Sequence, residues 1–196
     1  MMKNNGVRER KNGIDGIDIG AIMGINKNKT IHQIYLDKMN YIEKTKIDME
    51  AENNSNSEAV YWNLTLKEII SQEFSLRSSK KVRKENKQLV DEEHDYMVAD
   101  VDRRIVGENT ILLCKPENAF IIREWNGGDL PAIYILEAQH CMRISKADKC
   151  YIAAIIGGKK FAYKKVARDE KVIDMIVEIE KDFWVNNILN RIPPKA

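Results

Sequence analysis

Apolar residues recur three and four positions apart through several parts of the chain, which is the spacing of one face of an α-helix. Ile31, Ile34, Tyr35 and Met39 follow this spacing and predict a helix over residues 31–48. The other predicted helices are a short one after the glycine-rich turn within residues 11–30, a long one over residues 57–77, another over residues 132–144, and a last one that begins near Asp169 and is stopped by Pro193-Pro194.

Short β-branched segments between these helices predict strands. Tyr96–Asp102 and Thr110–Lys115 flank the turn signal Gly107-Glu108-Asn109, so we expect a hairpin there. Cys150–Ile156 and Phe161–Val166 predict two further strands, joined by a Gly-Gly-Lys-Lys turn. This order of elements predicts a mixed α/β (α+β) fold in which helices flank a small mixed central sheet.

Length and apolar content predict one domain over residues 1–196. The chain has 196 residues, 43% of them hydrophobic, which is enough to bury a single core. Residues 1–12 are polar and are expected to be flexible, and the Asn- and Ser-rich residues 51–57 are expected to form a loop.

The overall charge leaves nucleic-acid binding open. There are 32 basic and 30 acidic residues, a formal net charge of +2, so binding to phosphates would depend on where the basic residues cluster. One cluster is the basic stretch from Lys80 to Lys87. It fits either a solvated edge strand, where lysines discourage aggregation, or a contact to a phosphate backbone.

The cysteines and the N-terminus bear on cellular location. Cys114, Cys141 and Cys150 are odd in number and have no paired spacing, which fits neither a disulfide framework nor a paired-cysteine zinc site. We expect three reduced thiols. No apolar run is long enough to span a bilayer, and the polar N-terminus lacks the apolar core of a signal peptide. The chain is therefore expected in the cytoplasm, without a membrane partner.

Asp102 and Lys115 are the residues that carry a candidate chemistry. Nucleases that cut DNA with Mg²⁺ commonly place an aspartate on one strand and a Glu-x-Lys on the next, because hard Mg²⁺ prefers carboxylate oxygens and the lysine can assist the attacking water. Here Lys115 is present, but Leu113 occupies the position of the glutamate. By residue type alone, a surface pair of Asp102 and Lys115 would be unremarkable.

The chain resembles the YqaJ viral recombinase family, relatives of lambda exonuclease within the PD-(D/E)XK nuclease superfamily. The resemblance rests on motifs that occur in order along nearly the whole chain. They are Gly13-Ile14-Asp15-Gly16-Ile17-Asp18, Ala21-Ile22-Met23-Gly24-Ile25-Asn26, Glu58-Ala59-Val60-Tyr61-Trp62, Lys80-Lys81-Val82-Arg83, Asp102-Arg103-Arg104-Ile105-Val106-Gly107-Glu108, Gln139-His140, Tyr151-Ile152-Ala153-Ala154-Ile155-Ile156-Gly157-Gly158 and Glu180-Lys181-Asp182-Phe183-Trp184.

This resemblance implies a restriction-endonuclease-like core and Mg²⁺-dependent resection of linear duplex DNA. It also implies ring-shaped trimers and a single-strand annealing protein as a partner. The chain ends soon after Pro193-Pro194, whereas typical relatives are expected to continue, which puts the ring in question and leaves only some form of oligomer open.

Several positions depart from what the resemblance implies. Lys67 stands where a metal-binding glutamate is expected, and Leu113 replaces the glutamate of the strand. Together they make the site more positive by three charges, one at Leu113 and two at Lys67, so we expect little affinity for Mg²⁺. The other departures are Ile17 for a serine, Asn63 for a glycine, Pro116 for a threonine, and Glu137 and Cys141 for a glutamine and a tyrosine.

Asp102 and Lys115 are then the remnants of the catalytic set implied by the resemblance. Glu137 is a possible substitute carboxylate, Gln139 belongs to a matching motif, and Asp102 is the one expected metal ligand if any metal binds. No cofactor is expected unless nuclease activity persists, in which case it would be Mg²⁺ or Mn²⁺. The candidate DNA-binding residues are Lys67, Lys80, Lys81, Arg83, Lys84 and Arg103.

Three hypotheses follow. The first is a catalytically deficient phage-type protein that binds duplex DNA or DNA ends, its former cation site having become an anion site. The second is a phage inhibitor of host defence, such as an anti-CRISPR protein, which would act on a host protein in the bacterial cytoplasm. The third is a residual metal-dependent 5′–3′ double-strand DNA exonuclease that uses Asp102, Glu137 and Lys115.

Overall fold

A computed structural model describes residues 12–47, 58–121, 125 and 130–195. The expectations for residues 1–11 and 51–57 lie outside the described residues. The helices are α1 (Gly16–Ile22), α2 (Ile31–Ile47), α3 (Glu58–Ser78), α5 (Ala132–Ser145) and α6 (Glu170–Phe183), with a 3-10 turn, η1 (Ala119–Ile121), and a final π-helical segment, η2 (Trp184–Leu189). The strands are β1 (Val82–Lys84), β2 (Leu89–Val90), β3 (Val98–Ala99), β4 (Arg103–Ile105), β5 (Thr110–Glu117), β6 (Lys149–Ile156) and β7 (Lys160–Ala167).

The central sheet has five strands in the order β1-β4-β5-β6-β7. Its one parallel pair is β5 with β6, and the other neighbours are antiparallel. The parallel pair needs a crossover, which α5 provides. The prediction of a small mixed sheet flanked by helices is confirmed.

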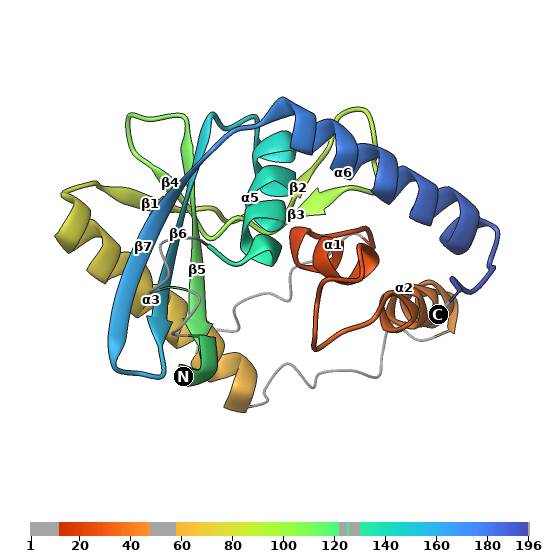
Figure 1. The fold of residues 1–196 in the computed structure, drawn as a ribbon, viewed down its shortest axis with the longest axis horizontal. Coiled ribbons are helices and arrows are strands. Elements are labelled where there is room, and N and C mark those ends of the chain that lie inside the picture. Colours follow the sequence, from red (N-terminus) through yellow and green to blue (C-terminus); the bar gives the residue numbers. More distant parts are fainter. Residues whose placement is uncertain (1–11, 48–57, 122–124, 126–129, 196) are drawn as a thin grey trace.

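Helices cover both faces of this sheet (Figure 1). Successive residues of a strand point to opposite faces, and β5 shows this clearly. Ile111 and Leu113 join the apolar cluster that α5 covers, whereas Leu112 and Cys114 join the cluster of Ile70 and Phe74 on α3. The sheet is therefore the middle layer between α3 and α5.

The helices α1, α2 and α6 lie beyond α5, on the side away from the sheet (Figure 1). The chain enters α1 through Ile14, which pairs with Met97 in an isolated parallel bridge. Asp169 begins α6 by accepting the backbone N–H groups of Lys171 at 3.0 Å and Val172 at 3.3 Å. No described helix is long and apolar enough to cross a membrane.

The predicted hairpin is wrong in one respect. The segment Tyr96–Asp102 is not one strand that faces Thr110–Lys115: β3 pairs with β2 in a separate two-stranded sheet, and the partner of β5 is β4. Asp102 therefore lies just before β4 rather than at the end of a longer strand. Charged Arg103 and Arg104 occupy β4, which obscured it in the apolar pattern.

Candidate functional site

The candidate site lies where α3 meets the edge of β4 and the middle of β5. Lys67 on α3 places its Nζ 2.9 Å from Oδ1 of Asp102, and the second oxygen of Asp102 accepts the backbone N–H of Cys114 at 2.8 Å. The side chains of Lys67 and Asp102 are 28% and 13% exposed, so the pair is largely shielded from water. Both oxygens of the aspartate therefore have a donor.

A second ion pair close to the first joins β5 to α5. Lys115 places its Nζ 2.6 Å from Oε1 of Glu137 on α5, and the side chains are 14% and 9% exposed. Burial alone would lower the pKa of Lys115, but the charge and hydrogen bond of Glu137 outweigh it and hold that pKa above its usual value. The Lys115 ammonium thus stays charged, and Glu137 serves as its counter-ion.

Leu113, between these two pairs in sequence, is 1% exposed and packs in the apolar cluster on the α5 side. The neighbouring thiol of Cys114 is also buried, and burial together with the charge of Asp102 raises its pKa. The position where the resemblance implies a metal-binding glutamate is therefore part of the hydrophobic core.

These residues do not fit a divalent metal ion. Mg²⁺ prefers several oxygen ligands, usually including one or two carboxylates. Here the carboxylate of Asp102 faces the ammonium of Lys67, and the other carboxylate of the set, that of Glu137, is paired with Lys115. Within the described ranges, no group of three or more His, Cys, Asp or Glu side chains could hold a metal ion.

Gln139 lies outside this pair of ion pairs. It donates to the backbone oxygen of Ala167 at 2.8 Å and accepts the backbone N–H of Asp169 at 3.0 Å, and it is 2% exposed. It therefore joins α5 to the turn between β7 and α6. The catalytic role of Gln139 stays a prediction, because both of these hydrogen bonds are to backbone groups of Ala167 and Asp169.

The predicted DNA-binding residues divide into two groups. Three are in ion pairs: Lys67 with Asp102, Lys80 with Glu108, and Arg103 with Glu68. Arg103 is also 5% exposed, so a phosphate would reach it only after that pair opened.

The other three, Lys81, Arg83 and Lys84, are exposed on or beside β1, at one edge of the sheet. No ion pair of theirs occurs among the residues that the structure describes. The edge-strand interpretation of this stretch is confirmed, and the lysines and arginine are placed where a phosphate backbone could reach them.

The sequence did not reveal a buried polar cluster between α5 and α6. His140 lies 2.7 Å from Oε1 of Glu180 and 2.8 Å from the backbone oxygen of Val98, and neither side chain of the His–Glu pair is exposed. Burial, opposed mainly by His140, raises the pKa of nearby Asp15 to about 6. His140 and Glu180 are forty residues apart, so only the fold brings them together.

Three comparisons with known proteins bear on this arrangement. Residues 7–148 match the family model described as the YqaJ-like viral recombinase domain. The chain belongs to this family. It is 38% identical to the uncharacterized protein YqaJ of Bacillus subtilis (strain 168) over 191 residues, which is 96% of this chain but 57% of that relative. The chain thus spans little more than half the length of the relative.

Solved structures of exonucleases have a fold similar to that of this chain. The alkaline exonuclease LHK-Exo from Laribacter hongkongensis has a TM-score of 0.71 at 12% identity, covering 91% of this chain and 92% of its own. A phage-related exonuclease from Haemophilus somnus 129PT has a TM-score of 0.58 at 14% identity, covering 90% and 96%. These likenesses confirm the predicted restriction-endonuclease-like fold.

Proposed function

We propose that this YqaJ-family chain binds duplex DNA, or the ends of duplex DNA, without cutting it. The observation that carries the proposal is the ammonium of Lys67 on the carboxylate of Asp102. Nucleases of this type commonly hold the metal ion near the scissile phosphate with two carboxylates. A fixed positive charge at one carboxylate and an apolar Leu113 in place of the second oppose that arrangement.

The surface for DNA is the basic edge of the sheet. Lys81, Arg83 and Lys84 are exposed on or next to the edge strand β1, and their charges are available to phosphates. Contacts of this kind carry no sequence information, and they weaken as salt rises because counterions are released from DNA on binding. The ion pairs at Lys67 and Lys115 change the sequence-based hypothesis of an anion site: each lysine charge is already offset by a carboxylate.

The test uses a short linear duplex in two parallel assays. Binding is followed by fluorescence anisotropy with EDTA, with Mg²⁺ and with Mn²⁺, and cleavage is followed on denaturing gels. We expect binding in all three conditions and cleavage in none. A double variant, Lys67→Glu with Leu113→Glu, restores both carboxylates and tests whether the lost residues account for the loss of cutting.

Two results would contradict the proposal. Metal-dependent cleavage by the natural chain that Asp102→Ala abolishes would establish the residual exonuclease instead. The absence of duplex binding even at low salt would refute the DNA-binding part of the proposal. The cleavage assay tests the other part, the absence of cutting, separately.

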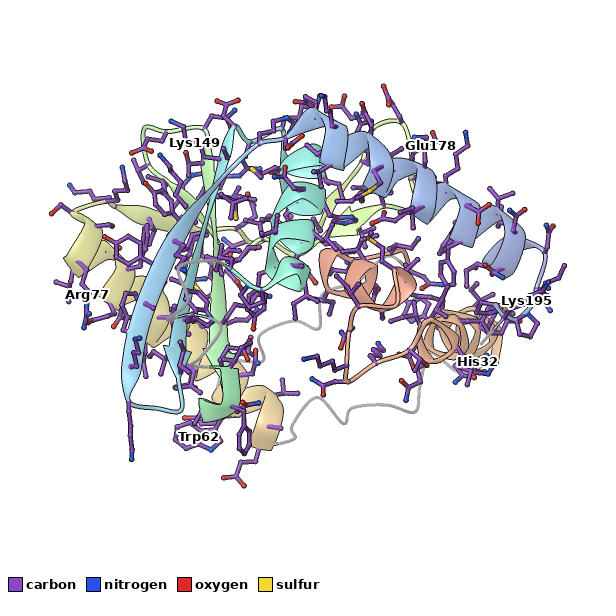
Figure 2. All side chains as sticks on the ribbon, viewed as in Figure 1. His32, Trp62, Arg77, Lys149, Glu178 and Lys195 are labelled. Atoms are coloured by element: carbon purple, nitrogen blue, oxygen red, sulfur yellow. The ribbon has the colours of Figure 1, made fainter. Side chains whose placement is uncertain are left out.

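A protein-binding role is the second candidate, and one observation favours it. The start of α3 exposes Val60, Tyr61, Trp62 and Leu64, with Trp62 50% and Leu64 63% exposed (Figure 2). Exposed apolar clusters of this kind mark sites of association. An inhibitor of host defence would block a purified DNA-targeting nuclease at equal concentration, and Tyr61→Ser with Leu64→Ser would relieve the block.

A further inference from the structure

The side chain of Lys67 crosses from α3 to the sheet at the place where α3 lies over β5. Its Nζ is 2.9 Å from Oδ1 of Asp102, and the other oxygen of Asp102 is held by the backbone N–H of Cys114 on β5. One carboxylate thus links the helix, the start of β4 and the middle strand of the sheet. This is the kind of cross-link that a bound metal ion makes between elements of a protein.

The charges in this region balance without any added ion. Lys67 offsets Asp102, and Lys115 offsets Glu137. An ammonium is a compact charge with three donors on a flexible stem, so it can take the place of a small cation beside a carboxylate. An added divalent ion would meet two ammonium groups and no unpaired carboxylate of this set.

We infer that Lys67 is a tethered cation that replaces a divalent metal in holding α3 to the sheet, so that the fold of this chain is assembled without metal. A side chain cannot be removed by chelation, and it cannot exchange with another ion. The domain should therefore keep one stability in the presence and absence of divalent metals. The inference concerns the folded chain alone and does not depend on DNA binding.

A neighbouring ion pair makes the inference testable without loss of the fold. Glu68, the next residue of α3, pairs with Arg103 of β4, whose side chain is 6% exposed. The helix is therefore held to the strand at two successive positions. Removal of the Lys67 charge should weaken the attachment of α3 without detaching it.

The experiment measures thermal unfolding of the purified chain by circular dichroism with EDTA, with millimolar Mg²⁺ and with millimolar Mn²⁺. The natural chain should show the same Tm in all three. Lys67→Met keeps the length of the stem and removes the charge, and its Tm should fall by about 2–6 °C with no response to metal.

Lys67→Glu is the decisive variant, because it places a second carboxylate beside Asp102. Its Tm should fall further in EDTA and should recover by about 2–6 °C in Mn²⁺, since a ligand that binds only the folded state raises stability. The matched control is Lys81→Glu, which makes the same charge reversal at an exposed lysine that has no ion pair among the described residues. It should show no metal response.

Three outcomes would overturn the inference. They are a rise in the Tm of the natural chain with either metal, a Lys67→Met variant as stable as the natural chain, and a Lys67→Glu variant that is indifferent to Mn²⁺. Because no DNA is present, these results are independent of the DNA-binding assays.

Discussion

The buried pair of His140 and Glu180 supports a quantitative prediction about stability. The two ring nitrogens of His140 face two acceptors, the carboxylate of Glu180 and the backbone oxygen of Val98. A neutral imidazole has one N–H, whereas the imidazolium has two and can satisfy both acceptors. Burial would lower the pKa of His140, but Glu180 and Val98 outweigh it and raise that pKa to about 9.

The magnitude follows from the complete burial of both side chains. His140→Leu leaves the Glu180 carboxylate in the core without its counter-ion, and breaking a buried pair in this way costs about 3–5 kcal/mol. Replacing both partners by apolar residues of similar volume is often nearly neutral. The variant His140→Leu with Glu180→Leu should therefore be more stable than either single variant.

The assay is urea unfolding of the natural chain, the two single variants and the double variant, followed by circular dichroism. The single variants should lose about 3–5 kcal/mol, and the double variant should lose less than either of them. If the loss in the double variant equals the sum of the single losses, the two residues are not coupled and the charged-pair interpretation is refuted.

Three further predictions concern pH, packing and charge. The pKa of His140 is higher in the folded chain, about 9, than its ordinary value of 6.5, so the stability that its proton contributes is complete below pH 6.5 and is lost as pH rises through about 9. The free energy of unfolding, measured by chemical unfolding across this range, should fall accordingly, and in His140→Gln it should depend less on pH. Gly13→Ala should lower the Tm sharply, because a Cβ at Gly13 would lie 2.5 Å from the backbone oxygen of Tyr96. In the same melt Gly20→Ala should cost less, because the tightest contact of its Cβ is with the side chain of Ile133 at 3.0 Å. Arg83→Glu with Lys84→Glu should weaken duplex binding at least tenfold at low salt, whereas Lys171→Glu with Lys181→Glu on α6, an equal change in charge, should leave the measured anisotropy titration nearly unchanged.

Periodicity located most elements to within one or two residues, because their apolar positions face a core. The helix predicted over residues 31–48 is α2 (Ile31–Ile47), and the one predicted over residues 132–144 is α5 (Ala132–Ser145). The missed strand, β4, is charged: Arg103 and Arg104 are accommodated by Glu68 and Glu85. A pattern of hydrophobic residues cannot reveal a strand whose buried side chain is an arginine, when the counter-ion of that arginine is 35 residues away in the sequence.

The family resemblance alone assigns Lys67 and Asp102 to one site, since both stand at positions where the family is expected to bind metal. It did not predict what each residue contacts. By its position Glu137 is a substitute carboxylate for the site, whereas the structure pairs it with Lys115 at 2.6 Å. A motif specifies position along the chain, whereas an ion pair also depends on the side chains that reach it from other elements.

Three of the departures from the family pattern are accommodated by neighbouring side chains. Lys67 forms an ion pair with Asp102, Glu137 forms one with Lys115, and Leu113 packs in the apolar cluster that α5 covers. Leu113→Glu alone would bury a carboxylate in that cluster, which costs several kcal/mol unless a counter-charge is present. A metal ion could supply that charge only if the Lys67 ammonium were also removed. Residues 67 and 113 are therefore coupled through the cation that a carboxylate at residue 113 requires, so Leu113→Glu should cost less stability in a Lys67→Glu background with Mn²⁺ than in the natural chain.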